Sequence, residues 1–178
     1  IGLWYIESGD YYSAEEVIVD WEDELTENPM FYYLSSRHLI ENRDQDSVNN
    51  AIEEAFRAER ESTSDYFRYN ISYILVSACT KNLEYSGENS KIPTEKSVML
   101  ELADDMIESV LNYDIDNPDF YSTKAEISIL RENWNEAEAA ISQGFGAIRA
   151  IHQDHTQFML DFHLLRYKMN SQLERRKL

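Results

Sequence analysis

The sequence predicts an all-α fold of about four helical hairpins followed by a C-terminal capping helix. Only five glycines and three prolines occur in 178 residues, too few for the many turns of an all-β domain. Apolar residues recur three and four positions apart, the period of one helix face. We expect the hairpins to occupy residues 1–152 and the final helix residues 153–178, in a chain long enough to bury a core.

The first hairpin is expected at the start of the chain. Residues 1–8 have the pattern of the end of a helix, and a second helix is predicted from Ser13 to Glu27. Ser13 followed by Glu16 fits a capping box, in which the two side chains bond free backbone N–H groups of the first turn. Asn28-Pro29 then closes the hairpin.

The second and third hairpins continue the same period. The second pairs residues 29–42, which are rich in aromatic side chains, with a helix over 47–61. The third pairs 64–85 with 94–113, and the segment between them has the Gly, Ser, Asn and Pro composition of a loop. This hairpin is longer than its neighbours, which we interpret as an insertion in the loop.

The stretch from Asn117 to Arg149 has the clearest hairpin pattern in the chain. Asn117-Pro118 favours a turn, and Pro118 fits the first turn of a helix. An apolar helical period follows until Asn133-Trp134-Asn135 interrupts it, and a second apolar run then continues to Ile148. Two short helices leave most of their apolar seam exposed, so this hairpin requires neighbouring helices.

The last helix carries an apolar stripe, made of Phe158, Phe162, Leu165, Met169 and Leu173. Such a helix covers the open end of a helical array, which needs a cap. Alternatively, it continues beyond Leu178 as a coiled coil or connector, and the chain then serves as an oligomerisation module that clusters an effector. The sequence begins without Met and shows no signal peptide, so we expect it to be part of a longer protein.

Small residues in the fourth hairpin follow a fixed spacing. Ala125 lies in its first helix, and Ala137 and Gly144 follow 12 and 19 positions later. Together with the turn Glu132-Asn133-Trp134, this spacing resembles a tetratricopeptide repeat over 33 residues. A second match lies near the start, where residues 9–14 carry the family's Gly-Asp-Tyr-x-x-Ala turn. The fourth hairpin departs from the family in having no Gly at its turn and no closing Pro.

The resemblance implies a right-handed α-solenoid in which the first helix of each hairpin lines a concave surface that holds an extended peptide or a partner helix. The lining then comes from residues 31–40, 65–83 and 120–130. Aromatic, basic and amide side chains recognise partners well because they bury area and keep a polar group. The candidates of this kind are Tyr33, Arg37, Tyr66, Arg68, Tyr69, Asn70, Tyr73, Tyr121 and Lys124. Asn70 with Arg37 or Arg68 would bracket a peptide backbone.

The charge is strongly acidic and uneven. Sixteen basic side chains oppose 34 acidic ones, for a net charge of −18. Residues 166–178 hold five basic side chains and one acidic one, so the rest of the chain carries 11 basic and 33 acidic, or −22. Because acidic surfaces repel phosphate backbones, nucleic acid is not expected as a partner. A protein or peptide partner of basic character is expected instead.

The sequence carries no pattern that predicts an enzyme, a metal site or a cofactor. It has no Gly-rich phosphate loop, no paired cysteines and no His-Glu-x-x-His helix. His152 and His155 have a spacing that could hold a metal, although isolated pairs of this kind are common by chance. Arg149 and His155 also have the spacing of the Arg-x-x-x-x-x-His motif of helical (HEPN) ribonucleases, which leaves RNA cleavage as a third alternative.

A cytoplasmic setting fits the remaining features. The single cysteine, Cys79, cannot form an internal disulfide and lies in an apolar context typical of a core residue. The mean hydropathy is −0.56, and no apolar run approaches 18 residues, so no membrane span is expected in this segment.

Overall fold

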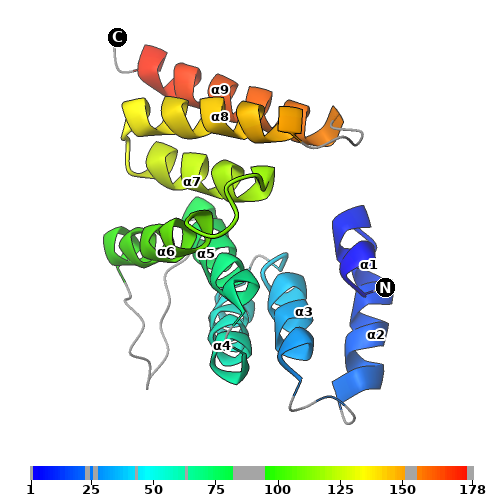
Figure 1. The fold of residues 1–178 in the computed structure, drawn as a ribbon. Coiled ribbons are helices and arrows are strands. Elements are labelled where there is room, and N and C mark those ends of the chain that lie inside the picture. Colours follow the sequence, from blue (N-terminus) through cyan, green and yellow to red (C-terminus); the bar gives the residue numbers. More distant parts are fainter. Residues whose placement is uncertain are drawn as a thin grey trace.

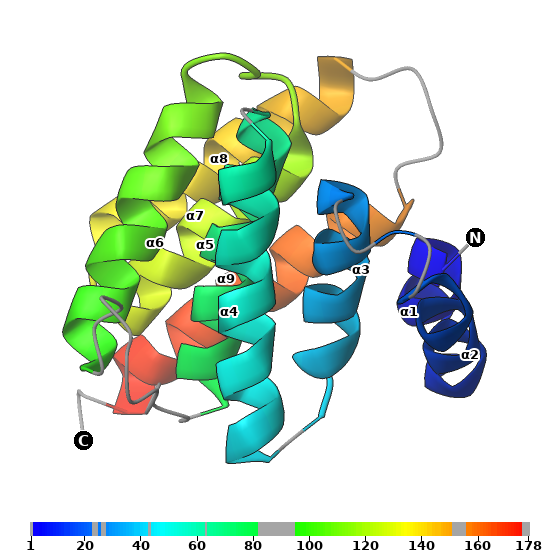
Figure 2. The ribbon, with the colours of Figure 1, turned by 90° about the horizontal axis from the view of Figure 1, so that it is seen from below.

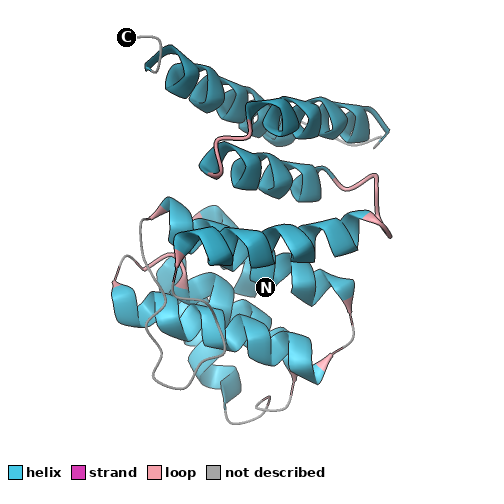
Figure 3. Cartoon of the chain, turned by 90° about the vertical axis from the view of Figure 1, so that its left-hand side faces the viewer, coloured by secondary structure: helices cyan, strands magenta, loops and turns pink. Residues whose placement is uncertain are grey.

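The computed structural model describes residues 2–22, 25, 28–42, 44–62, 64–81, 95–150 and 156–175. Helices are the only regular elements in these ranges, which confirms the all-α class (Figure 1, Figure 3). The helices are α1 (Gly2–Ser8), α2 (Tyr11–Glu22), α3 (Pro29–Leu39), α4 (Gln45–Glu61), α5 (Asp65–Thr80), α6 (Lys96–Leu111), α7 (Pro118–Leu130), α8 (Trp134–Ala150) and α9 (Thr156–Arg175).

The helices pack in a regular order. Each helix contacts the next one along the chain, and each odd-numbered helix also contacts the next odd-numbered helix, from α1 to α9. Figure 2 shows this for α3, which lies between the α1–α2 pair and α5. Within the described residues, the even-numbered helices contact only their neighbours in sequence. The odd-numbered helices therefore form one continuous layer, and the even-numbered helices lie outside it.

The two predicted Asn-Pro helix starts are confirmed. Pro29 and Pro118 are the first residues of α3 and α7. The Asn28 side chain accepts the N–H of Met30 at 2.9 Å, and the Asn117 side chain accepts that of Asp119 at 3.1 Å. A proline at this position loses no helical hydrogen bond, because the first N–H groups of a helix have no partner within it.

The two turns that resemble the repeat family share a backbone conformation. Gly9 has φ of 77° between α1 and α2, and Glu132 has φ of 61° between α7 and α8. Glycine adopts this left-handed conformation without a steric cost, whereas glutamate does not. The fourth hairpin thus keeps the turn geometry although its sequence lacks the glycine.

The predicted capping box at Ser13 is wrong. Helix α2 begins at Tyr11, and Asp10 caps it by accepting the Ser13 N–H at 3.2 Å and the Ser13 hydroxyl at 2.8 Å. Because the helix begins two residues before Ser13, the Ser13 N–H is one of the free donors of the first turn, and Asp10, which directly precedes the helix, is placed to accept it. The predicted start of the last helix at 153 and the loop over 86–93 lie outside the described residues.

Apolar clusters connect the layers along the whole array. The largest joins α4, α5 and α6 to the end of α3 and to α7, and a second joins α7, α8 and α9. Two smaller clusters lie among α1 to α5. Small residues allow the close approach in the second cluster: Ala125 and Ala137 are fully buried, and Gly144 faces the ring of Phe162. No described helix is long and apolar enough to cross a membrane.

Candidate functional site

A pocket of about 230 Å³ lies on the layer of odd-numbered helices, and all five of them line it. We call it the central pocket. Larger hollows beside Val19 and Leu100 are more open, and each is lined by only one or two neighbouring segments. The central pocket is lined by Glu7, Tyr33, Arg37, Tyr66, Tyr69, Tyr73, Asn117, Asp119, Phe120, Ser122, Thr123, Glu126 and Asp161.

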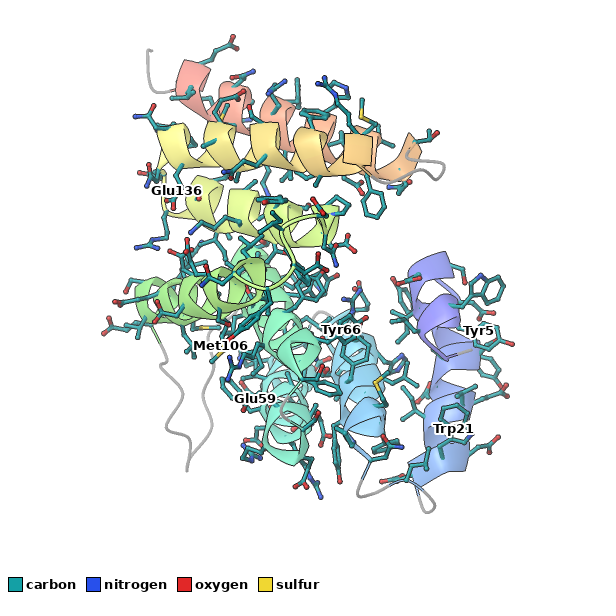
Figure 4. The ribbon with its side chains drawn as sticks, in the orientation of Figure 1. Tyr5, Trp21, Glu59, Tyr66, Met106 and Glu136 are labelled. Carbon is teal, nitrogen blue, oxygen red and sulfur yellow. The ribbon has the colours of Figure 1, made fainter. Side chains whose placement is uncertain are left out.

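Tyrosine rings form one wall of the central pocket. Tyr66, Tyr69 and Tyr73 follow each other on α5 at three- and four-residue spacing, so they share a helix face, with ring centroids 6.2 and 6.4 Å apart. Tyr33 of α3 extends the row, because its ring lies 5.1 Å from that of Tyr66 and the two hydroxyls are 2.9 Å apart. Tyr66 is labelled in Figure 4. Burial raises the pKa of Tyr33 and Tyr69, so both phenols stay neutral.

Arg37 brings a positive charge into this pocket. Its guanidinium carbon lies 3.9 Å from the centroid of the Tyr73 ring, a cation–π contact. Its Nε is buried and has no hydrogen-bond partner. Within the described residues, no carboxylate lies within ion-pair distance of this guanidinium. Arg37 therefore places a largely desolvated cation in the pocket without a carboxylate in ion-pair contact.

Carboxylates from three helices surround the rest of the pocket. Two of them have partners: Glu126 lies 3.6 Å from Lys168 Nζ, and Asp161 accepts a hydrogen bond from Gln157 at 2.8 Å. The Asp119 carboxylate forms neither an ion pair nor a hydrogen bond with the described side chains, and burial raises its pKa. A desolvated carboxylate of this kind favours an incoming cation.

A second pocket of about 260 Å³ extends the first one toward the end of the array. The two pockets share Ser122, Glu126 and Asp161, and the second adds Leu164, Leu165 and Lys168 of α9. Together they form a groove along the inner layer that begins at α1 and ends on an apolar and basic patch of α9. We call it the inner groove.

The structure brings five of the nine predicted residues together, since Tyr33, Arg37, Tyr66, Tyr69 and Tyr73 all line the central pocket. Two others on α5 point elsewhere. Asn70 is fully buried and donates to the Ser36 hydroxyl at 2.9 Å, so it joins α5 to α3. Arg68 lies beside Glu59 of α4, at 3.8 Å. These placements do not provide the predicted bracket around a peptide backbone.

The two predicted residues on α7 also lie away from the inner groove. Tyr121 packs against the apolar cluster that joins α7, α8 and α9. Lys124 is buried, with its Nζ 2.6 Å from Asp104, 2.6 Å from Glu108 and 3.0 Å from Glu136, so it links α6, α7 and α8. The face of α7 that lines the groove is instead the one that carries Asp119, Ser122 and Glu126.

Sequence reasoning missed the carboxylates of the central pocket. Asp119, Ser122 or Thr123, and Glu126 recur three and four positions apart, which marks a polar stripe on α7. That stripe was the available signal. The sequence gives no such signal for Glu7 and Asp161, because only the folded chain brings α1 and α9 to the same pocket.

The histidine patterns have no described geometry. His152 and His155 lie outside the described residues, and Arg149 is exposed on α8. Among the residues that are described, no three His, Cys, Asp or Glu side chains are arranged to hold a metal ion. The side chains that line the inner groove include tyrosine rings, hydroxyls and groups of opposite charge.

Comparison with known proteins gives no match to a family model, a curated protein or a solved structure. The likeness to tetratricopeptide repeats remains a resemblance in two turns and one set of small residues. The function is accordingly inferred from the inner groove.

Proposed function

We propose that this chain is a binding module that holds a peptide or a segment of a partner protein in the inner groove. In this proposal the helices form a right-handed α-solenoid like that of tetratricopeptide repeats, as the interaction or regulatory part of a longer protein. The continuous layer of odd-numbered helices supports this, because first helices line the concave side of such solenoids.

The single observation that carries the proposal is the tyrosine row of the central pocket. Four tyrosines from two helices present rings and hydroxyls to one pocket, and the groove continues from there to Leu164 on α9. Tyrosine is suited to recognition because it buries a large area with little loss of side-chain freedom and keeps a hydrogen-bonding group.

Charge selects the kind of peptide. Four carboxylates line the inner groove, from Glu7, Asp119, Glu126 and Asp161, against the two cations of Arg37 and Lys168. The surplus of negative charge favours a peptide with a net positive charge. Its affinity should fall as salt rises, because exposed charges are screened.

The test is to select peptides from a displayed random library on this chain and to measure their affinity by fluorescence anisotropy. Selected peptides should be rich in Lys and Arg, bind more weakly as NaCl increases, and lose affinity for Tyr66→Ala. Tyr113→Ala is the matched control, because Tyr113 is 77% exposed in the α6–α7 connection. Failure to select any peptide, or equal effects of both variants, would refute a binding role for the inner groove.

A second function, self-association through the terminal helix, is favoured by one observation. Leu160, Leu164 and Tyr167 of α9 are 51%, 55% and 73% exposed and follow a four- and three-residue spacing, so they form an apolar stripe. Sedimentation equilibrium tests it directly. A dimer that is lost in Leu160→Glu supports clustering by this segment, and a monomer at all concentrations rules it out.

A reducing, cytoplasmic setting is part of the proposal. Cys79 is buried in the large core cluster, and burial raises the pKa of its thiol to about 11. The thiol therefore stays protonated and unreactive, as expected of a cysteine that serves only in packing. Fractionation of the native cells, with an antibody against this chain, tests the location.

A further inference from the structure

Two opposite charges face the central pocket without pairing. Arg37 comes from α3 and Asp119 from α7, and the two side chains form no ion pair with each other. The helix between them, α5, holds them apart: Tyr73 stacks against the guanidinium at 3.9 Å, and Tyr69 packs against Phe120 of α7 at 4.9 Å. The pocket is thus positive on one side and negative on the other.

Both charges are costly where they stand. The buried Nε of Arg37 has no acceptor, and a buried donor without a partner loses the hydrogen bond that it made with water. Burial also disfavours the ionised form of Asp119, and the charge of Arg37 offsets this only in part, because the two groups form no ion pair and the pKa of Asp119 remains raised. A bound group that supplies a carboxylate at Arg37 and an ammonium at Asp119 removes both costs at once.

We propose that the central pocket binds a zwitterion, with its carboxylate at Arg37, its ammonium at Asp119 and its carbon skeleton against the tyrosine row. This deepens the proposed function and rests on the inner groove being the ligand surface. The pocket volume of about 230 Å³ is below the roughly 300–1,000 Å³ of pockets that take drug-sized ligands. The bound group is therefore about the size of one amino acid.

Ligands with a single charge fit this pocket less well. A simple anion at Arg37 faces the carboxylates of Glu7, Asp119 and Asp161, and a simple cation at Asp119 shares the pocket with Arg37. Like charges this close destabilise each other. Only a group that carries both charges finds a favourable partner on each side. Two sources have this chemistry: a free amino acid, and an acidic residue next to a basic one in a peptide.

The experiment measures binding to the full chain by calorimetry and by changes in the NMR spectrum, at ligand concentrations up to about 1 mM. One arm uses the free amino acids, together with their methyl esters, which lack the carboxylate, and their N-acetyl derivatives, which lack the ammonium. The other arm uses a peptide with both ends capped and an internal Lys-Glu-Lys. Binding of either probe type is expected. The affinity of the ester and N-acetyl forms should be lower by about tenfold or more.

Two variants, each with a matched control, assign the charges. Arg37→Gln should weaken the binding of the probe that carries a carboxylate about tenfold or more, whereas binding of its methyl ester should not weaken, because the repulsion between Arg37 and that cation is removed. Arg57→Gln is the control, because Arg57 also stacks on a tyrosine, Tyr32 at 4.1 Å, but lies outside the pocket. Asp119→Asn should weaken the binding of probes that carry the ammonium. Asp105→Asn is the control and should leave that binding unchanged, because Asp105 is exposed on α6. Circular dichroism verifies that each variant is folded.

The outcomes separate this inference from the proposed function. Binding of free amino acids alone, or of the capped peptide alone, supports the zwitterion site and identifies which of the two ligand types occupies it. Peptides that bind the inner groove equally well in the wild type, Arg37→Gln and Asp119→Asn would overturn the zwitterion site and leave the peptide-binding role standing. If neither the probes nor the library peptides bind the wild type, both proposals fail.

Discussion

Gly144→Ala tests how α9 docks on α8. A Cβ added at Gly144 would lie 2.0 Å from Cζ and 2.3 Å from Cε1 of Phe162. Carbon atoms in contact stay about 3.5–4.0 Å apart, so the ring would have to move by about 1.5 Å. Phe162 is fully buried, with its ring 5.4 Å from that of Phe145. Any such movement must therefore displace the surrounding core.

The expected change in the free energy of unfolding follows from a comparison with Gly146→Ala, a matched substitution two residues later in α8. A Cβ at Gly146 meets no heavy atom within 4 Å, so the change should stabilise the fold by about 0.5–1 kcal/mol through helix propensity alone. Gly144→Ala gains the same propensity but loses about 3 kcal/mol to overpacking, the upper end of the usual range. We expect a net loss of about 2 kcal/mol.

Urea unfolding followed by circular dichroism measures both variants. Their free energies of unfolding should differ by about 3 kcal/mol, and their melting temperatures by roughly 6–12 °C for a chain of this size. Replacing the ring should relieve the clash, so Gly144→Ala combined with Phe162→Leu should lose less than the sum of the two single changes. If Gly144→Ala is as stable as Gly146→Ala, α9 does not pack on α8 as described.

Three further predictions concern stability. Lys124→Met should cost about 2 kcal/mol in urea unfolding, because it leaves three carboxylates around a buried site without their cation; a change within error would mean that the cluster is solvated. Gly9→Ala should cost about 1 kcal/mol, because alanine is strained at φ of 77°, and thermal unfolding checks this against the gain expected for Gly146→Ala. Asp119→Asn should stabilise the fold more at pH 7 than at pH 4. The raised pKa of Asp119 means that the folded state binds more protons between the unfolded and folded pKa values, so the wild type loses stability as pH rises through that window. An equal gain at both pH values would contradict this.

The helices could be predicted because each leaves a local signal in the sequence. Apolar spacing predicted every described helix, and the Asn-Pro pairs predicted the starts of α3 and α7. Backbone conformation was harder to predict at the α7–α8 turn, where Glu132 occupies the left-handed position held by Gly9 in the first hairpin. Packing of the two helices maintains this turn against the preference of the glutamate side chain.

The candidate site could be predicted only in part, because helical period does not say which face meets which neighbour. On α5 the aromatic side chains repeat at Tyr66, Tyr69 and Tyr73, so the pattern itself marks the face that lines the pocket. On α7 apolar and small residues surround the helix, and the choice of Tyr121 and Lys124 was off by about one residue, or about 100° around the axis. Only the packing of α6 and α8 on either side decides that orientation.

The two charged sites on α7 differ in a way that supports a ligand role for the groove. Where α7 joins α6 and α8, the chain supplies Lys124 with three carboxylates at 2.6–3.0 Å. Five residues earlier on the same helix, Asp119 faces the central pocket without an ion pair, opposite an arginine that also forms none. Helix α7 thus has an ion-paired charge where it packs between α6 and α8. Charges that lower stability and remain unpaired are expected at sites kept for a ligand rather than for packing.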